Sequence, residues 1–172
     1  LPDSTMLFAA IVLAATLLMT RIVRDPRGAR PTDPRLIADA LRRLAIRPNE
    51  EERDMELLVA IEEALAKRTV TIDRFFFDWR GGNRRGPSPA DAVYEGTDFE
   101  RFRSLVGQYQ ALEGALDHDY WSDSEPCSMH IEEVETLWSK IDERDDWEGL
   151  NAKILEVRRM GEALRASDGA DA

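Results

Sequence analysis

The stretch RGGNRRG, residues 80–86, contains the residue types best suited to binding a ligand. Its glycines let the backbone approach another molecule closely, and Arg80, Arg84 and Arg85 could donate paired hydrogen bonds to a phosphate or carboxylate. The stretch lacks the Gly-Lys-Ser/Thr of a Walker loop, and no strand–glycine–helix pattern of a dinucleotide-binding fold surrounds it. The three arginines are therefore candidates for binding an anion or a partner protein.

A structural interpretation of the same stretch is the one we favour. Gly81 or Gly82 would end the preceding helix in the left-handed conformation, and the residues after it would form a solvated turn. Before that turn, Phe75, Phe76 and Trp79 share one face at helical spacing. On this interpretation Trp79→Ala costs about 3–5 kcal/mol, whereas an alanine at position 84 costs almost nothing.

A second group of reactive residues consists of His118, Cys127 and His130. Zinc binds Cys and His at such short spacings, but a closed zinc site needs four ligands and these residues are spread over a loop. Cys127 and a histidine could form a nucleophilic pair, yet no oxyanion-hole pattern accompanies them. We expect a surface loop that packs Tyr120 and Trp121 on the helices, with no metal ligand and no catalytic residue.

Acidic residues are concentrated between Glu132 and Asp146, where paired carboxylates could bind calcium or transfer protons. Their spacing is not that of an EF-hand loop. Rows of acids on helix faces and at helix starts usually face solvent. Solvation is therefore the interpretation that we favour for this series.

Composition excludes some classes of function. The chain has 172 residues and a formal net charge of −11, which argues against nucleic-acid binding because that needs a basic face. Residues 1–48 carry +4 and the rest carry −15, an asymmetry typical of a solvated helix face or of a segment with an anionic partner. Cys127 is the single cysteine, so no intrachain disulfide can form, and this fits a reducing compartment.

The run MLFAAIVLAATLLM, Met6–Met19, carries no charge. An apolar run of this length is more often a packing helix than a membrane span, which needs ~20 residues. The arginines that follow would suit the cytoplasmic flank of a membrane anchor at residues 6–23, and this alternative stays open. A secretory signal fits poorly because no basic residue precedes the run. We predict an apolar N-terminal helix over residues 1–25 that packs in the core or anchors the chain.

The remaining chain is predicted to contain a linker at residues 26–33, a helical domain at 34–166 and a disordered tail at 167–172. Apolar residues recur at helical spacing throughout the domain, so the fold class is all-α: an irregular bundle of roughly six to eight short and medium helices with two long loops. The predicted helix caps are Asp33, Asn49, Thr71, Thr97 with Glu100, and Ser128.

Each predicted helix has an apolar stripe that we expect to face the core. In the first half of the domain these stripes are Leu36–Ile37–Ala40–Leu41–Leu44, Met55–Leu58–Ile61–Leu65, Ile72–Phe75–Phe76–Trp79 and Phe99–Phe102–Val106–Tyr109. In the second half they are Ile131–Val134–Leu137–Trp138–Ile141 and Trp147–Leu150–Ile154–Val157–Met160.

Three segments resemble the C-terminal helical region of bacterial selenoprotein O/YdiU-like proteins. These are FFFDWRGG (Phe75–Gly82), PCSMHIEEVETLWSKIDERDDW (Pro126–Trp147) and KILEVRRMGEAL (Lys153–Leu164), and the similarity spans about Pro34 to Leu164. The resemblance implies a pseudokinase family that transfers AMP from ATP to Ser, Thr or Tyr of proteins, with Mg or Mn. The family's catalytic and nucleotide-binding residues lie upstream of the matched region, so the resemblance assigns no catalytic residue and no cofactor to this chain.

The expected function is that of a helical accessory region of a YdiU-like protein adenylyltransferase, inactive alone because the kinase-like core is absent. Its partner would be that kinase-like domain or another protein, and no nucleic acid. A truncated or split gene would explain the missing core and the initial Leu, and the redox cysteine that many members have near the C-terminus is also missing. The alternative is a small helical interaction or scaffold protein, held at a membrane by residues 6–23. The expected location is cytoplasmic, or on the inner membrane with the domain facing the cytoplasm.

Overall fold

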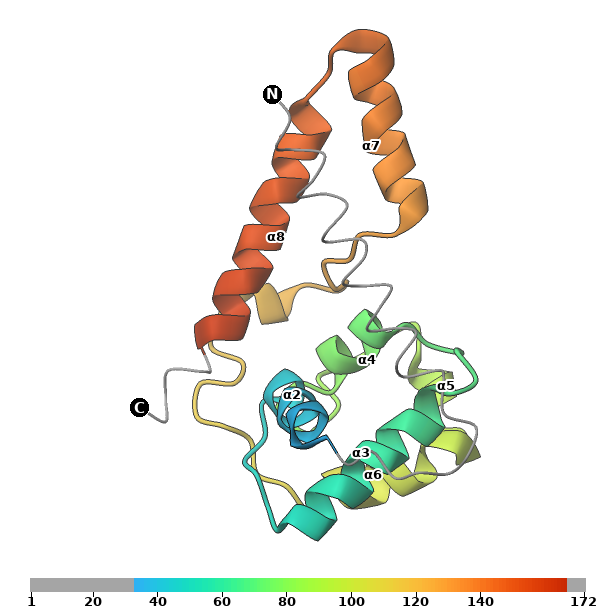
Figure 1. Ribbon diagram of the computed structural model, residues 1–172, viewed down its shortest axis with the longest axis vertical. Coiled ribbons are helices and arrows are strands. Elements are labelled where there is room, and N and C mark those ends of the chain that lie inside the picture. Colours follow the sequence, from blue (N-terminus) through green and yellow to red (C-terminus); the bar gives the residue numbers. More distant parts are fainter. Residues whose placement is uncertain (1–32, 167–172) are drawn as a thin grey trace. The chain divides into compact units, whose positions relative to one another are not determined.

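A computed structural model of the chain describes residues 33–166, which form seven α-helices and two short 3-10 helices (Figure 1). The described helices belong to one compact unit, which begins at Pro34. Within residues 33–166 there is no β-strand, only an isolated bridge between Ile46 and Ala111, so the predicted all-α fold is confirmed. Residues 1–32 and 167–172 lie outside the described residues. The predictions of an apolar N-terminal helix, of most of the linker and of the tail concern these residues.

The larger of two hydrophobic cores lies between α2 (Pro34–Leu44), α3 (Glu51–Leu65) and α6 (Glu100–Val106). As predicted, each helix buries one apolar face, although on α3 the buried face is centred on Leu57 and Ile61 while Met55 is only half-buried. The fully or almost fully buried members of this core include Leu44, Ile46, Leu57, Ala64, Phe75, Tyr94, Phe99, Phe102 and Val106.

The short helix α4 (Ile72–Asp78) supplies aromatic residues to both cores. The Thr71 hydroxyl caps it, as predicted, by accepting a backbone N–H of the first turn at 3.3 Å. Phe75 is completely buried, and the ring of Trp79 meets that of Phe102 edge-on at 4.9 Å. Phe77 points into the second core, so α4 ties the two cores together.

The second core is small and joins α4 to η2 (Asp119–Ser122) and α8 (Glu148–Ala166). Phe77 packs edge-on against Tyr120 at 5.4 Å and beside Trp121 at 5.8 Å. The sequence prediction that the second long loop packs its aromatic residues on the helices agrees with these contacts. Ala163 of α8 completes this core.

Two predicted helix starts in the first half of the domain differ in the structure. Asn49 does not cap α3: its backbone N–H donates to the Asp54 carboxylate at 3.0 Å, and Glu50 occupies the cap position without a side-chain bond. The predicted capping box of Thr97 does not form because η1 (Thr97–Phe99) precedes α6 and Gly96 occupies its cap position. A short helix, α5 (Asp91–Tyr94), lies before this turn.

The most important difference concerns α7 (Ile131–Arg144) and α8, which form a helical hairpin. His130, not Ser128, occupies the cap position of α7. No residue of α7 is buried, and α8 buries only Lys153 and Ala163. Of the ten residues predicted to face the core on these two helices, six are half-buried, and Ile131, Trp138, Trp147 and Ile154 are exposed.

Candidate interaction surface

Arg80, the first of the three predicted binding arginines, is 1% exposed and serves the fold. Its Nη1 donates to the carbonyl oxygens of Arg42 and Arg43, both at 3.0 Å, and so satisfies carbonyls at the C-terminal end of α2. Its guanidinium lies over the Trp121 ring, 4.6 Å from the centroid, and its Nε donates to Ala115 at 3.4 Å. These contacts occupy the side chain that an anion would need.

Arg84 and Arg85 are partly buried and point to different neighbours. Arg84 donates to the carboxylate of Asp91 and lies over the Tyr94 ring at 4.8 Å. Arg85 donates to the Trp121 carbonyl and lies over the Phe77 ring at 4.0 Å. Burial lowers the pKa of Arg85, although nearby acids oppose that effect. The structure therefore does not bring the three arginines together around one open site.

The glycines of this loop behave as the structural interpretation predicted. Gly81 and Gly82 have φ angles of +82° and +75°, in the left-handed region, and they end the segment that follows α4. The N–H of Gly81 donates to the Leu44 carbonyl at 2.7 Å, so the loop closes against α2. A Cβ atom on Gly82 would lie 2.9 Å from Cγ2 of Ile46, which leaves no room for a side chain.

Asp78 is a buried carboxylate that holds the loop in place. It accepts hydrogen bonds from the Ser88 hydroxyl at 2.7 Å and the Tyr94 hydroxyl at 2.9 Å, and Arg74 approaches it at 3.5 Å. Burial and the neighbouring Asp78 charge raise the pKa of Tyr94, so the phenol stays protonated and donates. Asp78 is buried and its partners are internal side chains, so we interpret the network as structural.

The residues considered as metal ligands or nucleophile lie apart. Nδ1 of His118 accepts the backbone N–H of Tyr120 at 3.1 Å, and the N–H of Cys127 donates to the Tyr120 hydroxyl at 2.9 Å. Burial raises the pKa of the Cys127 thiol, which disfavours the reactive thiolate. Within residues 33–166, no three His, Cys, Asp or Glu side chains lie close enough to share a metal ion.

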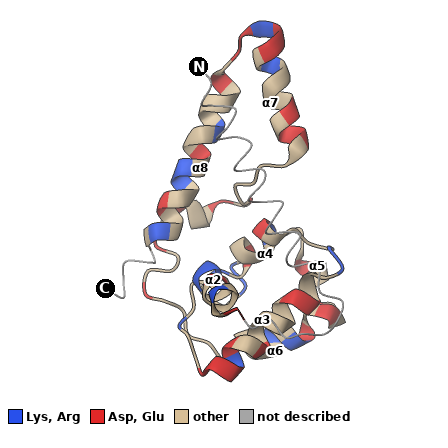
Figure 2. Ribbon diagram, in the orientation of Figure 1, with Lys and Arg blue, Asp and Glu red and all other residues tan. Residues whose placement is uncertain are grey.

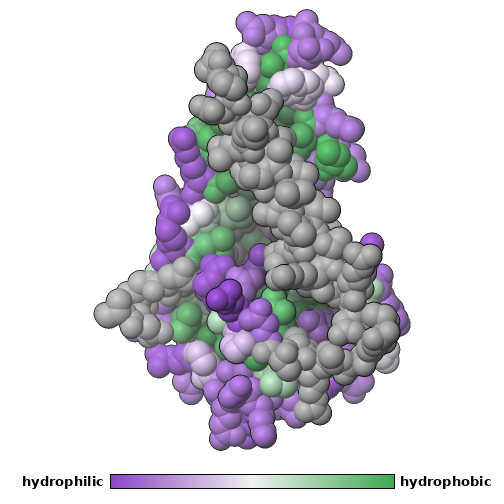
Figure 3. Space-filling model, in the orientation of Figure 1, coloured by the Kyte–Doolittle hydropathy of each residue, from purple (hydrophilic) through white to green (hydrophobic). Residues whose placement is uncertain are grey.

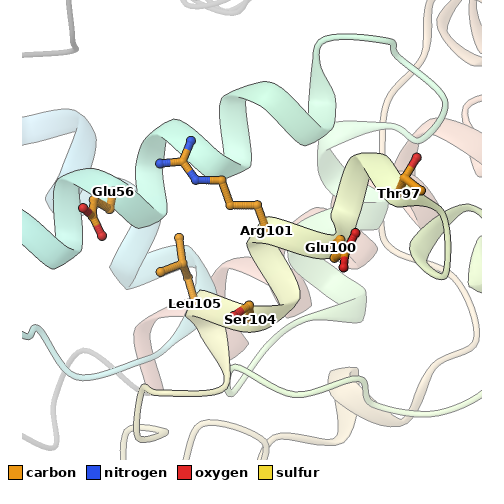
Figure 4. Close-up of a pocket in the computed structure, with 6 residues that line it drawn as sticks. All are labelled: Glu56, Thr97, Glu100, Arg101, Ser104 and Leu105. Atoms are coloured by element: carbon orange, nitrogen blue, oxygen red, sulfur yellow. The ribbon is translucent and has the colours of Figure 1, made fainter.

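A shallow groove lies between α3 and the η1–α6 segment (Figure 4). Its lining residues are Glu56, Thr97, Glu100, Arg101, Ser104 and Leu105. Figure 4 shows that Arg101 reaches toward α3, where its Nη1 pairs with Glu63 at 2.8 Å, while Glu100 and Thr97 lie toward the other end of the groove. The polar side chains do not converge on one point, so this groove is a poor candidate for a small-molecule site.

The α7–α8 hairpin is held by a few specific contacts. Lys153 is 9% exposed, and its Nζ bonds to Glu133 of α7 at 2.7 Å, to Glu156 of α8 at 2.8 Å and to the Ser128 carbonyl at 3.2 Å. Burial acts to lower the pKa of Lys153, but the bonds to the two glutamates outweigh it and raise the pKa. The ammonium group is therefore charged at all ordinary pH values and links the two helices.

Near the turn of the hairpin, α7 and α8 approach each other closely at Gly149. A Cβ atom on Gly149 would lie 2.9 Å from Cδ2 of Leu137, so the absence of a side chain sets the distance between the helices. Asp145 ends α7 in the left-handed conformation, with φ +54°, and its carboxylate accepts the indole N–H of Trp147 at 2.8 Å. At the other end, the Arg159 side chain pairs with Asp119 and Asp123 and fixes α8 to η2.

Large apolar side chains lie exposed on this otherwise well-defined hairpin. Ile131 and Trp138 are each 64% exposed, Trp147 is 48% exposed, and Ile154 is 39% exposed. Leu155 is 63% exposed as well, but one residue after Ile154 it is turned by about 100° away from this group. Figure 3 shows hydrophobic residues over both helices of the hairpin on the side turned to the viewer. We call Ile131, Trp138, Trp147 and Ile154 the hairpin face.

Helix geometry places these four residues on one side of the hairpin. Residues seven apart on a helix lie almost two turns apart, so Ile131 and Trp138 share one side of α7. Trp147 directly precedes the first residue of α8, and extending the helical spacing by that one residue puts it on the same side as Ile154. On α7 the exposed pair lies about a third of a turn onward from Leu137, and on α8 it lies about 0.4 of a turn onward from Gly149, the two residues that meet between the helices. Because the helices run in opposite directions, these similar rotations bring both pairs to the same side.

Charged residues flank the hairpin face. Glu135 and Asp142 follow Ile131 and Trp138 by four residues and therefore border the face on α7, away from α8. Arg158 borders it on α8 by the same spacing from Ile154. Figure 2 shows acidic residues along α7 and at the turn, and basic residues toward the C-terminal end of α8. An apolar centre with a charged border is the composition typical of a protein–protein interface.

Sequence reasoning found the apolar stripes of the hairpin but not their role as a surface. The signal that could have indicated it is the pair of tryptophans beside an acidic series, on two helices that follow the main aromatic core. The site residues that the sequence did propose, Arg80, Arg84 and Arg85, make the internal contacts described above, and their binding of an anion or a partner stays a prediction.

Neither a protein-family model, nor a curated protein, nor a solved structure matches the chain. In the part of the chain that the structure describes, no helix has the length and apolar character needed to cross a bilayer. Residues 6–23, proposed above as a membrane anchor, lie outside that part.

Proposed function

We propose that this chain is a non-catalytic helical interaction module that binds a protein through the hairpin face. The observation that carries the proposal is the exposure of two tryptophans and two isoleucines on the α7–α8 hairpin. Fully burying one such side chain stabilises a complex or fold by about 1.5–3 kcal/mol. Contiguous exposed apolar patches of this kind usually mark interaction sites in soluble proteins.

The rigid base of the hairpin supports the same proposal. Lys153 joins both helices to the preceding loop, and Arg159 fixes α8 to η2. A preorganised surface loses less conformational entropy on binding than a flexible one does. Tryptophan is also the residue type most enriched among energetically dominant interface residues. Trp138 and Trp147 are therefore the side chains expected to dominate binding.

Site-specific photocross-linking tests this proposal. The full chain is expressed in cells with a photoreactive amino acid at position 138. The matched control carries the same amino acid at position 101, on α6 and outside the hairpin. We expect a discrete cross-linked protein species at position 138 and not at position 101. Equal cross-linking at the two positions, or none at position 138, would contradict the proposal.

A second candidate partner comes from the resemblance described above. Trp138 and Trp147 both fall in the segment Pro126–Trp147 that resembles YdiU-like proteins, so a kinase-like adenylyltransferase domain is one candidate occupant of the hairpin face. The test is to add the purified full chain to such a domain with ATP, Mg or Mn and a protein acceptor. Transfer of AMP that depends on Trp138 would support this candidate, and robust transfer by the chain alone would contradict the non-catalytic proposal.

A further inference from the structure

We infer that the partner of the hairpin face is a second copy of this chain, and that two hairpins associate face to face as a four-helix assembly. The inference rests on the proposed function, because it names the occupant of the same surface. Three features of the hairpin favour a second copy over an unrelated protein. They are the arrangement of its apolar side chains in layers, the charges along its edges and its two-helix width.

The apolar side chains of the hairpin face form two layers at matched heights. The contact of Leu137 with Gly149 and the ion pair of Glu133 with Lys153 show which residues of α7 and α8 lie level. The same register places Trp138 level with Trp147, so the two indoles form one layer near the turn. It places Ile131 level with Ile154, so the two isoleucines form a second layer toward the base.

A two-fold axis can run parallel to α7 and α8 within the surface of the hairpin face. This axis sets each layer of one copy against the same layer of the second copy. It brings α7 of each copy opposite α8 of the other while both turns stay at the same end. Tryptophans then meet tryptophans, and isoleucines meet isoleucines, without any shift. Such a patch is self-complementary, as an isologous interface requires, and two antiparallel helices are half of a four-helix bundle.

The charges on the edges favour the same axis. The α7 edge carries Glu135 and Asp142, and the α8 edge carries Asn151 and Arg158. The axis along the hairpin sets each acidic edge beside the neutral and basic edge of the second copy. A two-fold axis across the hairpin would instead pair the α7 edges and bring Glu135 of both copies together, which is unfavourable.

Sedimentation velocity of the purified full chain at micromolar concentration tests the inference. We expect a species with twice the mass of the chain. The variants Trp138→Ala and Trp147→Ala should each weaken self-association about tenfold, as expected for a central tryptophan of an interface. Leu116→Ala is the matched control, because Leu116 is an exposed apolar residue outside the hairpin, and it should leave the mass unchanged.

A charge reversal tests the orientation. Arg158→Glu places acidic groups on both edges of the face and should weaken self-association, more strongly at low salt than at high salt. Far-ultraviolet circular dichroism of each variant establishes that the helices are intact, as expected for substitutions at exposed positions.

The outcomes separate the inference from the proposed function. A wild-type chain that stays monomeric overturns the inference, and so does a dimer that neither tryptophan substitution weakens. If the chain is monomeric while position 138 cross-links to a different protein, the second copy is excluded as the occupant and the proposed function stands. If the chain is monomeric and position 138 cross-links to nothing, both are overturned.

Discussion

At the scale of single residues, the arginines differ in what their positive charges do. Arg80 is enclosed and caps the end of α2, whereas Arg84 stays partly exposed and pairs with an exposed acid, Asp91. A buried charge held by several acceptors is costly to disturb, and a pair at the surface contributes little. The sequence identified these residues as one group because residue type and spacing do not reveal burial.

Arg80→Ala should lower the free energy of unfolding by about 3 kcal/mol, because it leaves the Arg42 and Arg43 carbonyls without their donor and opens a cavity beside Trp121. Arg80→Lys should restore less than half of the loss, since a lysine cannot reproduce the planar fork. Urea denaturation followed by circular dichroism measures both.

Arg84→Ala is the matched control, and its expected cost is about 1 kcal/mol. That is more than the near-zero cost predicted from the sequence, because Arg84 lies over Tyr94 and bonds to Asp91. Equal losses for Arg80→Ala and Arg84→Ala would refute the assignment of Arg80 as the buried cap.

Glu62 on α3 gives a prediction on pH. Burial, and secondarily the charge of Glu63, raise the pKa of Glu62 above 4.5 in the folded chain. The folded state therefore binds more protons than the unfolded state, and stability falls as the pH rises through this window. Glu62→Gln removes the cost of holding a charged, partly buried carboxylate in the folded state. The variant should therefore be more stable than wild type at neutral pH, and it should lose this advantage below the pKa that Glu62 has in the unfolded chain. Thermal melts of both proteins between acid and neutral pH measure the difference in stability. If the variant becomes more stable relative to wild type as the pH falls, the pKa of Glu62 is lowered in the folded chain and the prediction is wrong.

At the scale of helices and loops, sequence patterns predicted what each element is better than where it packs. The α4 helix, its Thr71 cap and the glycine stop at Gly81 and Gly82 followed from spacing and local chemistry, and the structure confirms them. The caps at Asn49 and Ser128 were wrong: Glu50 occupies the cap position of α3 and His130 that of α7. Local signals identify caps only where no neighbouring residue competes.

The hairpin stripes show the same limit more strongly. Ile131 and Trp138 recur at helical spacing, as predicted, but periodicity cannot say whether the apolar side meets the core of this unit or another surface. The positions of α3, α6 and η2 relative to the hairpin decide which of its apolar side chains become buried. Those positions depend on contacts between residues far apart in the sequence. The candidate interaction surface could therefore not be predicted from the sequence, although its residues could.

Gly149→Ala tests how the hairpin closes. The added methyl group would lie 2.9 Å from the Leu137 side chain, so the helices must separate or Leu137 must change rotamer. We expect a loss of about 1–2 kcal/mol in the free energy of unfolding, with the largest increase in amide hydrogen exchange in α7 and the first turns of α8.

Gly107→Ala provides the control for that experiment. Gly107 follows α6 with a helical backbone, and its added Cβ would meet only ordinary contacts. It should be neutral or slightly stabilising because alanine has less freedom than glycine in the unfolded chain. If Gly149→Ala proves equally harmless, the close approach of α7 and α8 is not a constraint.

At the scale of the whole chain, two pairs of tryptophans have different roles. Trp79 and Trp121 are buried in the two cores, whereas Trp138 and Trp147 are exposed on the hairpin face. Residues 33–166 thus contain a folded aromatic core and a separate apolar surface. The core does not bury the second pair.

The two roles predict opposite effects of alanine substitution. Trp79→Ala should cost about 3–5 kcal/mol of folding free energy, as for other large buried aromatic residues. Trp138→Ala should change the stability of the dilute monomer by less than about 0.5 kcal/mol, but should reduce association. Chemical denaturation at low protein concentration separates these effects, since self-association itself would stabilise the fold at high concentration. A large loss for Trp138→Ala in the dilute monomer would mean that Trp138 supports the fold.

Hydroxyl-radical footprinting of the four tryptophans tests the central claim most directly, because it reports the solvent exposure of each indole. Trp79 and Trp121 should be protected under all conditions and serve as internal references. If the hairpin face binds a protein, Trp138 and Trp147 should be oxidised readily in the dilute purified chain and become protected together in concentrated chain or in cells that express it. Equal oxidation of Trp138 and Trp147 under all these conditions would contradict the account.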